Sequence, residues 1–161
     1  EGMTTGNNCF VFGRSGSCVH NGFTSNASWT RNSDCRKKCN IQTSALGLDF
    51  ITALKPVTFQ FRPSKDQPEA WKMWKDELDE DGEPTGNKIY HYQDTEKVMT
   101  GMIAQDVKTA LDASSVDVDS FGGWSEHEIT GIQNIADSMF VFPLINAVKE
   151  LTTRVTALED A

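Results

Sequence analysis

The chain has 161 residues, of which 38% are hydrophobic and 24% are charged, and its formal net charge is −8. This length suits one ordinary domain or a small domain with an appendage. The negative charge disfavours sequence-independent binding to nucleic acid and binding to an anionic membrane surface. The printed residues contain no apolar run long enough to cross a bilayer and no signal-peptide pattern. Because the hydrophobic content is low, we expect part of the apolar surface to be buried against other chains.

Four cysteines lie in the first quarter of the chain. Without a secretory signal, we expect their thiols to stay reduced rather than to pair. Cys35 and Cys39 could share a helix face and bind zinc with Cys9, Cys18 or His20, but these spacings differ from the usual short zinc knuckle. We therefore expect free, partly buried thiols, no metal and no cofactor.

Residues 1–32 are rich in Gly, Ser, Asn and Thr, and their short apolar pieces show no helical period. This composition predicts short strands and turns. Within it, Asn21 and Gly22 predict a type I′ hairpin turn between a strand that ends at His20 and another that begins at Phe23.

The polar segment 33–41 places Ser33 five residues before Lys38, without an intervening Gly or Pro. One helical turn would bring the lysine amine back toward the serine hydroxyl. A serine hydroxyl becomes a good nucleophile when a base takes its proton, and a neutral lysine amine can be that base. The simpler interpretation is a solvated helix start with Ser33 or Asp34 as its N-cap.

A helix and a strand are predicted next. Thr43 or Ser44 would cap the helix, and Pro56 would end it. Its apolar face would consist of Ala45, Leu48, Ile51 and Leu54. Apolar and polar residues then alternate over residues 57–61, which predicts a half-buried strand.

The middle of the chain, Arg62 to Gly86, is polar and acidic, which predicts a long surface loop with a short helix that carries Trp71 and Trp74. Its acidic run lacks the ligand order of an EF-hand calcium loop.

Beyond this loop we expect a strand pair, a helix and a turn-rich stretch. The strand pair would be Lys88–Tyr92 with Lys97–Ile103, the helix Ala104–Leu111, and the turn-rich stretch Ser114–Trp124.

The C-terminal residues repeat apolar positions at alternating steps of four and three, beginning just after Pro143. These positions are Leu144, Val148, Leu151, Val155 and Leu158. They form the a/d seam of two heptads, which indicates a coiled coil or, alternatively, one amphipathic helix packed on its own domain. The lean core favours a self-associating bundle.

Four blocks of the sequence, in this order and spacing, resemble the endosialidase-type C-terminal intramolecular chaperone, a self-cleaving domain of phage tailspikes, tail fibres and neck appendages. They are Ser-Asp-Cys-Arg-Lys-Lys with a following Ile (33–41), the segment 43–61 with its Leu-Lys-Pro-Val-Thr-Phe, Gly-Met-Ile-Ala-Gln-Asp-Val (101–107), and Pro-Leu-Ile-Asn-Ala-Val-Lys-Glu-Leu (143–151). The resemblance covers about Ser33 to Ala161. The departures from the family pattern lie at Met102, Asp106 and Val148 and in a missing proline near Asp112, so none affects the Ser33 and Lys38 pair.

The resemblance implies an α+β fold, with short strands and a C-terminal helix that forms a trimeric bundle or coiled coil. Residues 1–32 would be the end of the mature fibre, and residues 33–161 the chaperone, with its C-terminal helix at 140–161. The implied partners are two further copies of the chain and its own N-terminal region as substrate, without nucleic acid or membrane. Assembly in the host cytoplasm would place the fibre in the virion tail, and cleavage would release the chaperone.

The resemblance also implies that the chain cleaves itself once, with Ser33 as nucleophile and Lys38 as general base. We expect Ser33 to attack the carbonyl of Asn32, and the Ser33–Asp34 bond is the alternative site. A competing interpretation is a non-catalytic trimerisation domain at the receptor-binding tip of a fibre, in which both residues are structural.

Overall fold

The computed structural model describes residues 9–14, 17–22, 30–91 and 95–161, with side chains from residue 31 onward. The chain divides into two compact units, Glu1–Thr43 and Ser44–Ala161, each of which is described by itself. The predicted cleavage point at residue 33 lies within the first unit.

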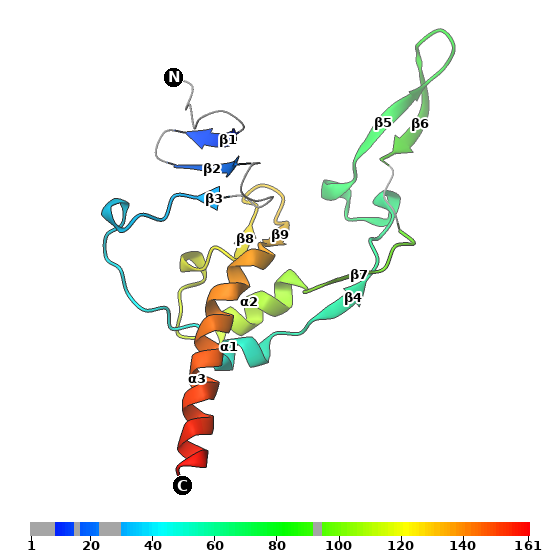
Figure 1. Ribbon diagram of the computed structural model, residues 1–161. Coiled ribbons are helices and arrows are strands. Elements are labelled where there is room, and N and C mark those ends of the chain that lie inside the picture. The colour runs from blue at the N-terminus through cyan, green and yellow to red at the C-terminus, as the bar shows by residue number, and fades with distance from the viewer. Residues whose placement is uncertain (1–8, 15–16, 23–29, 92–94) are drawn as a thin grey trace. The chain divides into compact units, whose positions relative to one another are not determined.

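The described residues contain short strands, three α-helices and short 3-10 helices, joined by irregular segments (Figure 1). The strands are β1 (Cys9–Arg14), β2 (Ser17–Gly22), β3 (Thr30–Arg31), β4 (Val57–Phe59), β5 (Trp74–Leu78), β6 (Pro84–Tyr90), β7 (Met99–Gly101), β8 (Trp124–Glu126) and β9 (Gln133–Ile135). The helices are α1 (Leu48–Ala53), α2 (Ala104–Asp112) and α3 (Val141–Glu159). The strand pairs are β1–β2, β2–β3, β4–β7, β5–β6 and β8–β9, all antiparallel. The predicted α+β fold with a C-terminal helix is confirmed.

The first unit contains the sheet β1–β2–β3, in agreement with the strands predicted for residues 1–32. The predicted hairpin turn at Asn21 and Gly22 is wrong, because both residues belong to β2 and pair with Phe10 and Cys9 of β1. The Asn-Gly preference for a turn is local, whereas the register of β1 with β2 extends through both positions. Phe23 lies outside the described residues.

The core of the second unit is formed by α1, α2 and the segments on either side of β8 and β9. Three phenylalanines meet at its centre. Phe121 contacts Phe50 and Phe140 edge-on, with ring centroids 5.7 and 5.3 Å apart, and Phe50 stacks on Phe140 at 6.3 Å. Burial of each such side chain contributes about 1.5–3 kcal/mol. Leu111 and Val107 of α2 are almost completely buried beside them.

Helix α1 is shorter than predicted, because it begins at Leu48 and its N-cap position is Gly47 rather than Thr43 or Ser44. The hydroxyl of Ser44 instead accepts a hydrogen bond from the backbone of Leu46. The chain before α1 is therefore not helical, and the groups that hold it are described with the candidate site.

The half-buried strand predicted for residues 57–61 is confirmed over β4, with Val57 and Phe59 more buried than Thr58. It ends two residues earlier than predicted, and Phe61 is exposed. Its partner is β7, so the predicted pairing of Lys88–Tyr92 with Lys97–Ile103 is wrong. Strand β6 pairs with β5 instead, and Tyr92 lies outside the described residues.

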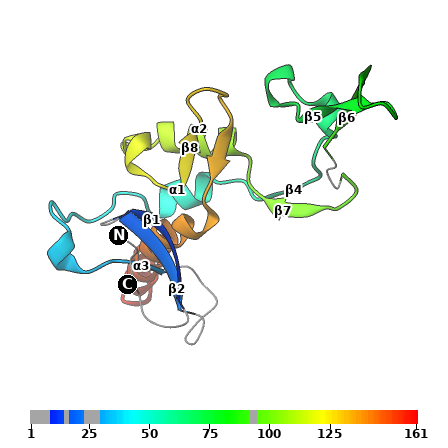
Figure 2. The ribbon, with the colours of Figure 1, turned by 90° about the horizontal axis from the view of Figure 1, so that it is seen from above.

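The loop predicted for residues 62–86 is present up to residue 73 and includes a short 3-10 helix, Glu69–Trp71, that carries Trp71 as predicted. From Trp74 onward the prediction is wrong, because β5 and β6 form a hairpin, which lies beyond the β4–β7 pair in Figure 2. The acidic run forms its connection, where the Asp79 carboxylate accepts hydrogen bonds from the backbone of Asp81 and Glu83. Gly82 adopts the left-handed conformation there, with φ of 84°. Trp74, predicted in a helix, lies in β5 under the Lys88 ammonium, 3.6 Å from the ring centroid.

The predicted C-terminal helix is confirmed as α3. Its five seam side chains, listed above, are between 46% and 78% exposed in the single chain. Figure 1 shows the C-terminal end of α3 extending beyond α1 and α2. Within the described residues, no helix is both long enough and apolar enough to span a bilayer.

Candidate active site

A tight turn follows Ser33 directly. Asp34 caps a 3-10 helix at Cys35–Lys37, and its carboxylate accepts a 2.9 Å hydrogen bond from the backbone N–H of Arg36. The backbone N–H groups of Lys37 and Lys38 donate to the carbonyls of Asp34 and Cys35, each at 3.0 Å. Of the two N-caps considered from the sequence, Asp34 is the one observed. This turn reverses the chain and returns Lys38 toward Ser33.

The structure brings the two predicted site residues into contact. The Lys38 Nζ donates a hydrogen bond of 2.7 Å to the Ser33 Oγ. Once the amine is neutral, the same contact can run in the opposite direction, with the hydroxyl as donor, which is the first step of proton transfer to a base. Ser33, Lys38 and Asn32 are all exposed in the single chain, so both peptide bonds considered for cleavage are accessible.

A second contact in the turn was not predicted from the sequence. The guanidinium of Arg36 holds the Asp34 carboxylate with two hydrogen bonds, from Nε to Oδ1 at 3.0 Å and from Nη2 to Oδ2 at 2.6 Å. The hydrogen bond from Arg36 lowers the pKa of Asp34 below its usual value, and the carboxylate raises the pKa of Arg36. Because the pKa of Asp34 is lowered, the Asp34–Arg36 pair is fully formed at pH values above the ordinary pKa of an aspartate. It is lost as the pH falls through the lowered pKa.

The two cysteines beside this pair, Cys35 and Cys39, are free and exposed, so the prediction of partly buried thiols is wrong for them. They belong to a stretch from residue 31 to 45 in which every residue is exposed in the single chain. The side chains of Cys9, Cys18 and His20 lie outside the described residues. In the part of the chain with described side chains, no cluster of His, Cys, Asp or Glu is arranged to hold a metal ion.

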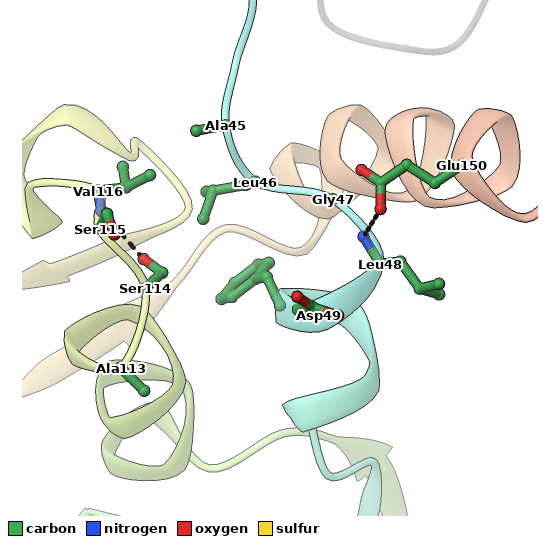
Figure 3. A pocket seen from close by; sticks show the side chains of 11 residues that line it. Ala45, Leu46, Gly47, Leu48, Asp49, Ala113, Ser114, Ser115, Val116 and Glu150 are labelled. Atoms are coloured by element: carbon green, nitrogen blue, oxygen red, sulfur yellow. Dashed lines mark hydrogen bonds between the residues drawn. The ribbon is translucent and has the colours of Figure 1, made fainter.

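Helix α3 holds the chain that leads into α1, through polar residues that lie between the seam positions. The Asn146 amide donates to the carbonyls of Ser44 and Leu46, at 3.2 and 3.0 Å. The Glu150 carboxylate accepts a 3.1 Å hydrogen bond from the backbone N–H of Leu48 (Figure 3). Glu150 therefore caps α1 in place of the side chain that Gly47 lacks.

These contacts of α3 were missed in the sequence because each joins residues about one hundred positions apart. Gly47 has a role in the same contact, since a Cβ at this position would overlap the Glu150 carboxylate. One signal in the sequence could have indicated this contact. A glycine just before a helix has no side chain to cap it, so the cap must come from a residue elsewhere in the chain.

Loss of the Glu150 cap should destabilise the second unit. We expect Glu150→Ala to lower the free energy of unfolding by about 1 kcal/mol, the usual effect of losing a helix cap. Glu150→Gln should restore most of this loss, because its amide oxygen can accept the same hydrogen bond. Urea denaturation followed by circular dichroism measures the effect, with exposed Lys149→Ala as the control. Equal midpoints for Glu150→Ala and Lys149→Ala would show that the cap contributes nothing.

Comparison with known protein families finds one match. Residues 33–115, slightly more than half of the chain, match the model of the family described as chaperone of endosialidase. The matched range starts at Ser33 and contains Lys38 and α2, but it ends before α3. No curated protein and no solved structure matches the chain.

Proposed function

The chain belongs to the family of chaperones of endosialidase, and on this premise we propose that it is the C-terminal intramolecular chaperone of a phage tail fibre or tailspike. It promotes folding as a homotrimer and then releases itself by autoproteolysis at Ser33. The observation that carries this proposal is the 2.7 Å contact between the Ser33 hydroxyl and the Lys38 amine at the first residue of the matched range. Residues 1–32 then remain with the fibre in the virion tail, and residues 33–161 leave as the chaperone.

The first chemical step is an acyl shift within the chain. Lys38, as a neutral amine, takes the proton of the Ser33 hydroxyl, and the oxygen attacks the carbonyl carbon of Asn32. The bond between that carbon and the Ser33 nitrogen breaks, and Lys38 returns the proton to the departing nitrogen. The product is an ester between the Asn32 acyl group and the Ser33 oxygen, next to a free amine.

The second step is hydrolysis of that ester. Water adds to the Asn32 carbonyl and displaces the Ser33 oxygen, which regains its proton. Asn32 becomes a C-terminal carboxylate and Ser33 a new N-terminus. The two products separate, so each chain reacts only once.

Ring size favours the Asn32–Ser33 bond over the Ser33–Asp34 bond. Attack on the carbonyl of the preceding residue closes a five-membered ring, and this proximity alone can supply several orders of magnitude in rate. Attack of Ser33 on its own carbonyl would close a strained four-membered ring. We therefore propose cleavage between Asn32 and Ser33.

Trimerisation links the chaperone role to the chemistry. In the single chain Ser33 and Lys38 are exposed, and water stabilises the ammonium form of a lysine, which cannot act as a base. Cover by neighbouring chains would remove this water and favour the neutral amine. The exposed seam of α3 offers the surface on which three copies associate. Cleavage then follows correct assembly and locks the fibre by removing the route back to the unfolded state.

Replacement of the two neighbouring lysines tests the proposed base. Lys38→Ala should slow cleavage by about 10²- to 10⁴-fold, the usual contribution of a positioned general base. Lys37→Ala is the matched control and should slow cleavage only slightly, because Lys37 changes the charge of the segment but does not contact the hydroxyl. A denaturing gel of the purified chain over time gives both rates. Equal loss in the two variants would show that the charge of the segment matters and that Lys38 is not the base.

A further inference from the structure

The turn contains one group that would interfere with the proposed base. Asp34 is the only acidic side chain among residues 31–43, and it lies four positions before Lys38. A long, flexible lysine side chain this close in the chain can reach such a carboxylate and form an exposed ion pair with it. Such a pair would stabilise the ammonium form of Lys38 and would draw it away from the Ser33 hydroxyl. In the structure Lys38 contacts the hydroxyl instead.

Arg36 accounts for this difference. Its side chain and backbone together donate three hydrogen bonds to the Asp34 carboxylate, two to Oδ1 and one to Oδ2. Bidentate pairing with arginine is among the strongest contacts that a carboxylate makes, and it occupies both oxygens. The other charged side chains of this unit that the structure describes are cationic. They are Arg31, Lys37 and Lys38.

We propose that Arg36 is a positioning residue, which sequesters the Asp34 carboxylate so that the Lys38 amine stays on Ser33 and can lose its proton. This inference rests on the proposed function, because it assigns a role in the same reaction. Arg36 does not touch the reacting atoms and acts through Asp34. The cationic charge of Arg36 is paired with the Asp34 carboxylate, so its main effect on Lys38 comes through Asp34.

Cleavage of the full chain as a function of pH tests this role. We expect Arg36→Gln to slow cleavage at neutral pH by about threefold, the scale of an exposed ion pair formed between Asp34 and Lys38. At high pH, where the amine is neutral in both proteins, the rates of Arg36→Gln and of the wild type should converge. Lys37→Gln removes the same charge without touching the carboxylate, so it should have the smaller effect.

The double variant separates sequestration from a general structural role. Asn at position 34 can still cap the turn but carries no charge, so Arg36→Gln combined with Asp34→Asn should cleave as fast as Asp34→Asn alone. A double variant as slow as Arg36→Gln, or a loss that persists at high pH, would overturn the proposal.

A second readout does not depend on cleavage. In the uncut Ser33→Ala chain, the reactivity of each lysine toward an acylating reagent can be followed by mass spectrometry against pH. Because Asp34 also acts on Lys37 through charge, Arg36→Gln should move the half-reaction pH of both lysines upward, and that of Lys38 by the larger amount. If Lys38 does not move, the inference fails, even where the wild-type chain cleaves and the proposed function holds.

Discussion

Ser33→Ala is expected to leave the chain at full length under conditions in which the wild-type chain is cut. Removal of the nucleophile eliminates the acyl shift, so the rate should fall by at least about 10³-fold. The residue is exposed and its hydroxyl contacts only Lys38 among the described groups, so we expect the fold and the trimer to be unchanged.

A denaturing gel measures the cleavage of this variant, and sedimentation measures its assembly. Thr43→Ala is a matched control, because it removes an exposed hydroxyl from the same segment without affecting the proposed dyad. Cleavage of the Ser33→Ala chain at the same bond would show that the assigned nucleophile is wrong.

Leu151→Asp is expected to dissociate the trimer. The side chain lies in the middle of the α3 seam and is 46% exposed in the single chain, so in the proposed trimer it is buried against the other copies. An aspartate there would bring three unpaired carboxylates into an apolar interface, at a cost of at least several kcal/mol. Cleavage should fall in parallel, because we propose that the dyad becomes active only under the cover of neighbouring chains.

The matched control for this variant is Thr153→Asp, which adds the same charge to α3 at an exposed position off the seam. It should remain trimeric and should cleave at close to the wild-type rate. Sedimentation of Leu151→Asp as an intact trimer would refute the role of the seam. Rapid cleavage of a Leu151→Asp monomer would refute the dependence of the reaction on assembly.

The sequence predicted the features that depend on residues close together in the chain. The contact of Ser33 with Lys38 follows from their spacing across one turn, and the exposed seam of α3 follows from its heptads. The Asp34–Arg36 pair is equally local and was missed, because Asp34 was considered only as an N-cap.

Features that depend on distant partners were not predicted. The α1 cap comes from Glu150, so neither Thr43 nor Ser44 indicates where the helix begins. Similarly, the acidic run after Trp74 has the composition of a solvated loop. The hairpin forms because residues of β5 pair with residues of β6, which lie further along the chain.

Intact-mass measurement of the assembled wild-type chain during incubation is the most direct test of self-cleavage by the Ser33–Lys38 pair. The account predicts two products, one that ends at Asn32 and one that begins at Ser33, at a rate that does not change on dilution while the trimer persists. The same measurement on Lys38→Ala should show only the full-length mass. A wild-type trimer that stays at full length, or cleavage of Lys38→Ala at the wild-type rate, would contradict it.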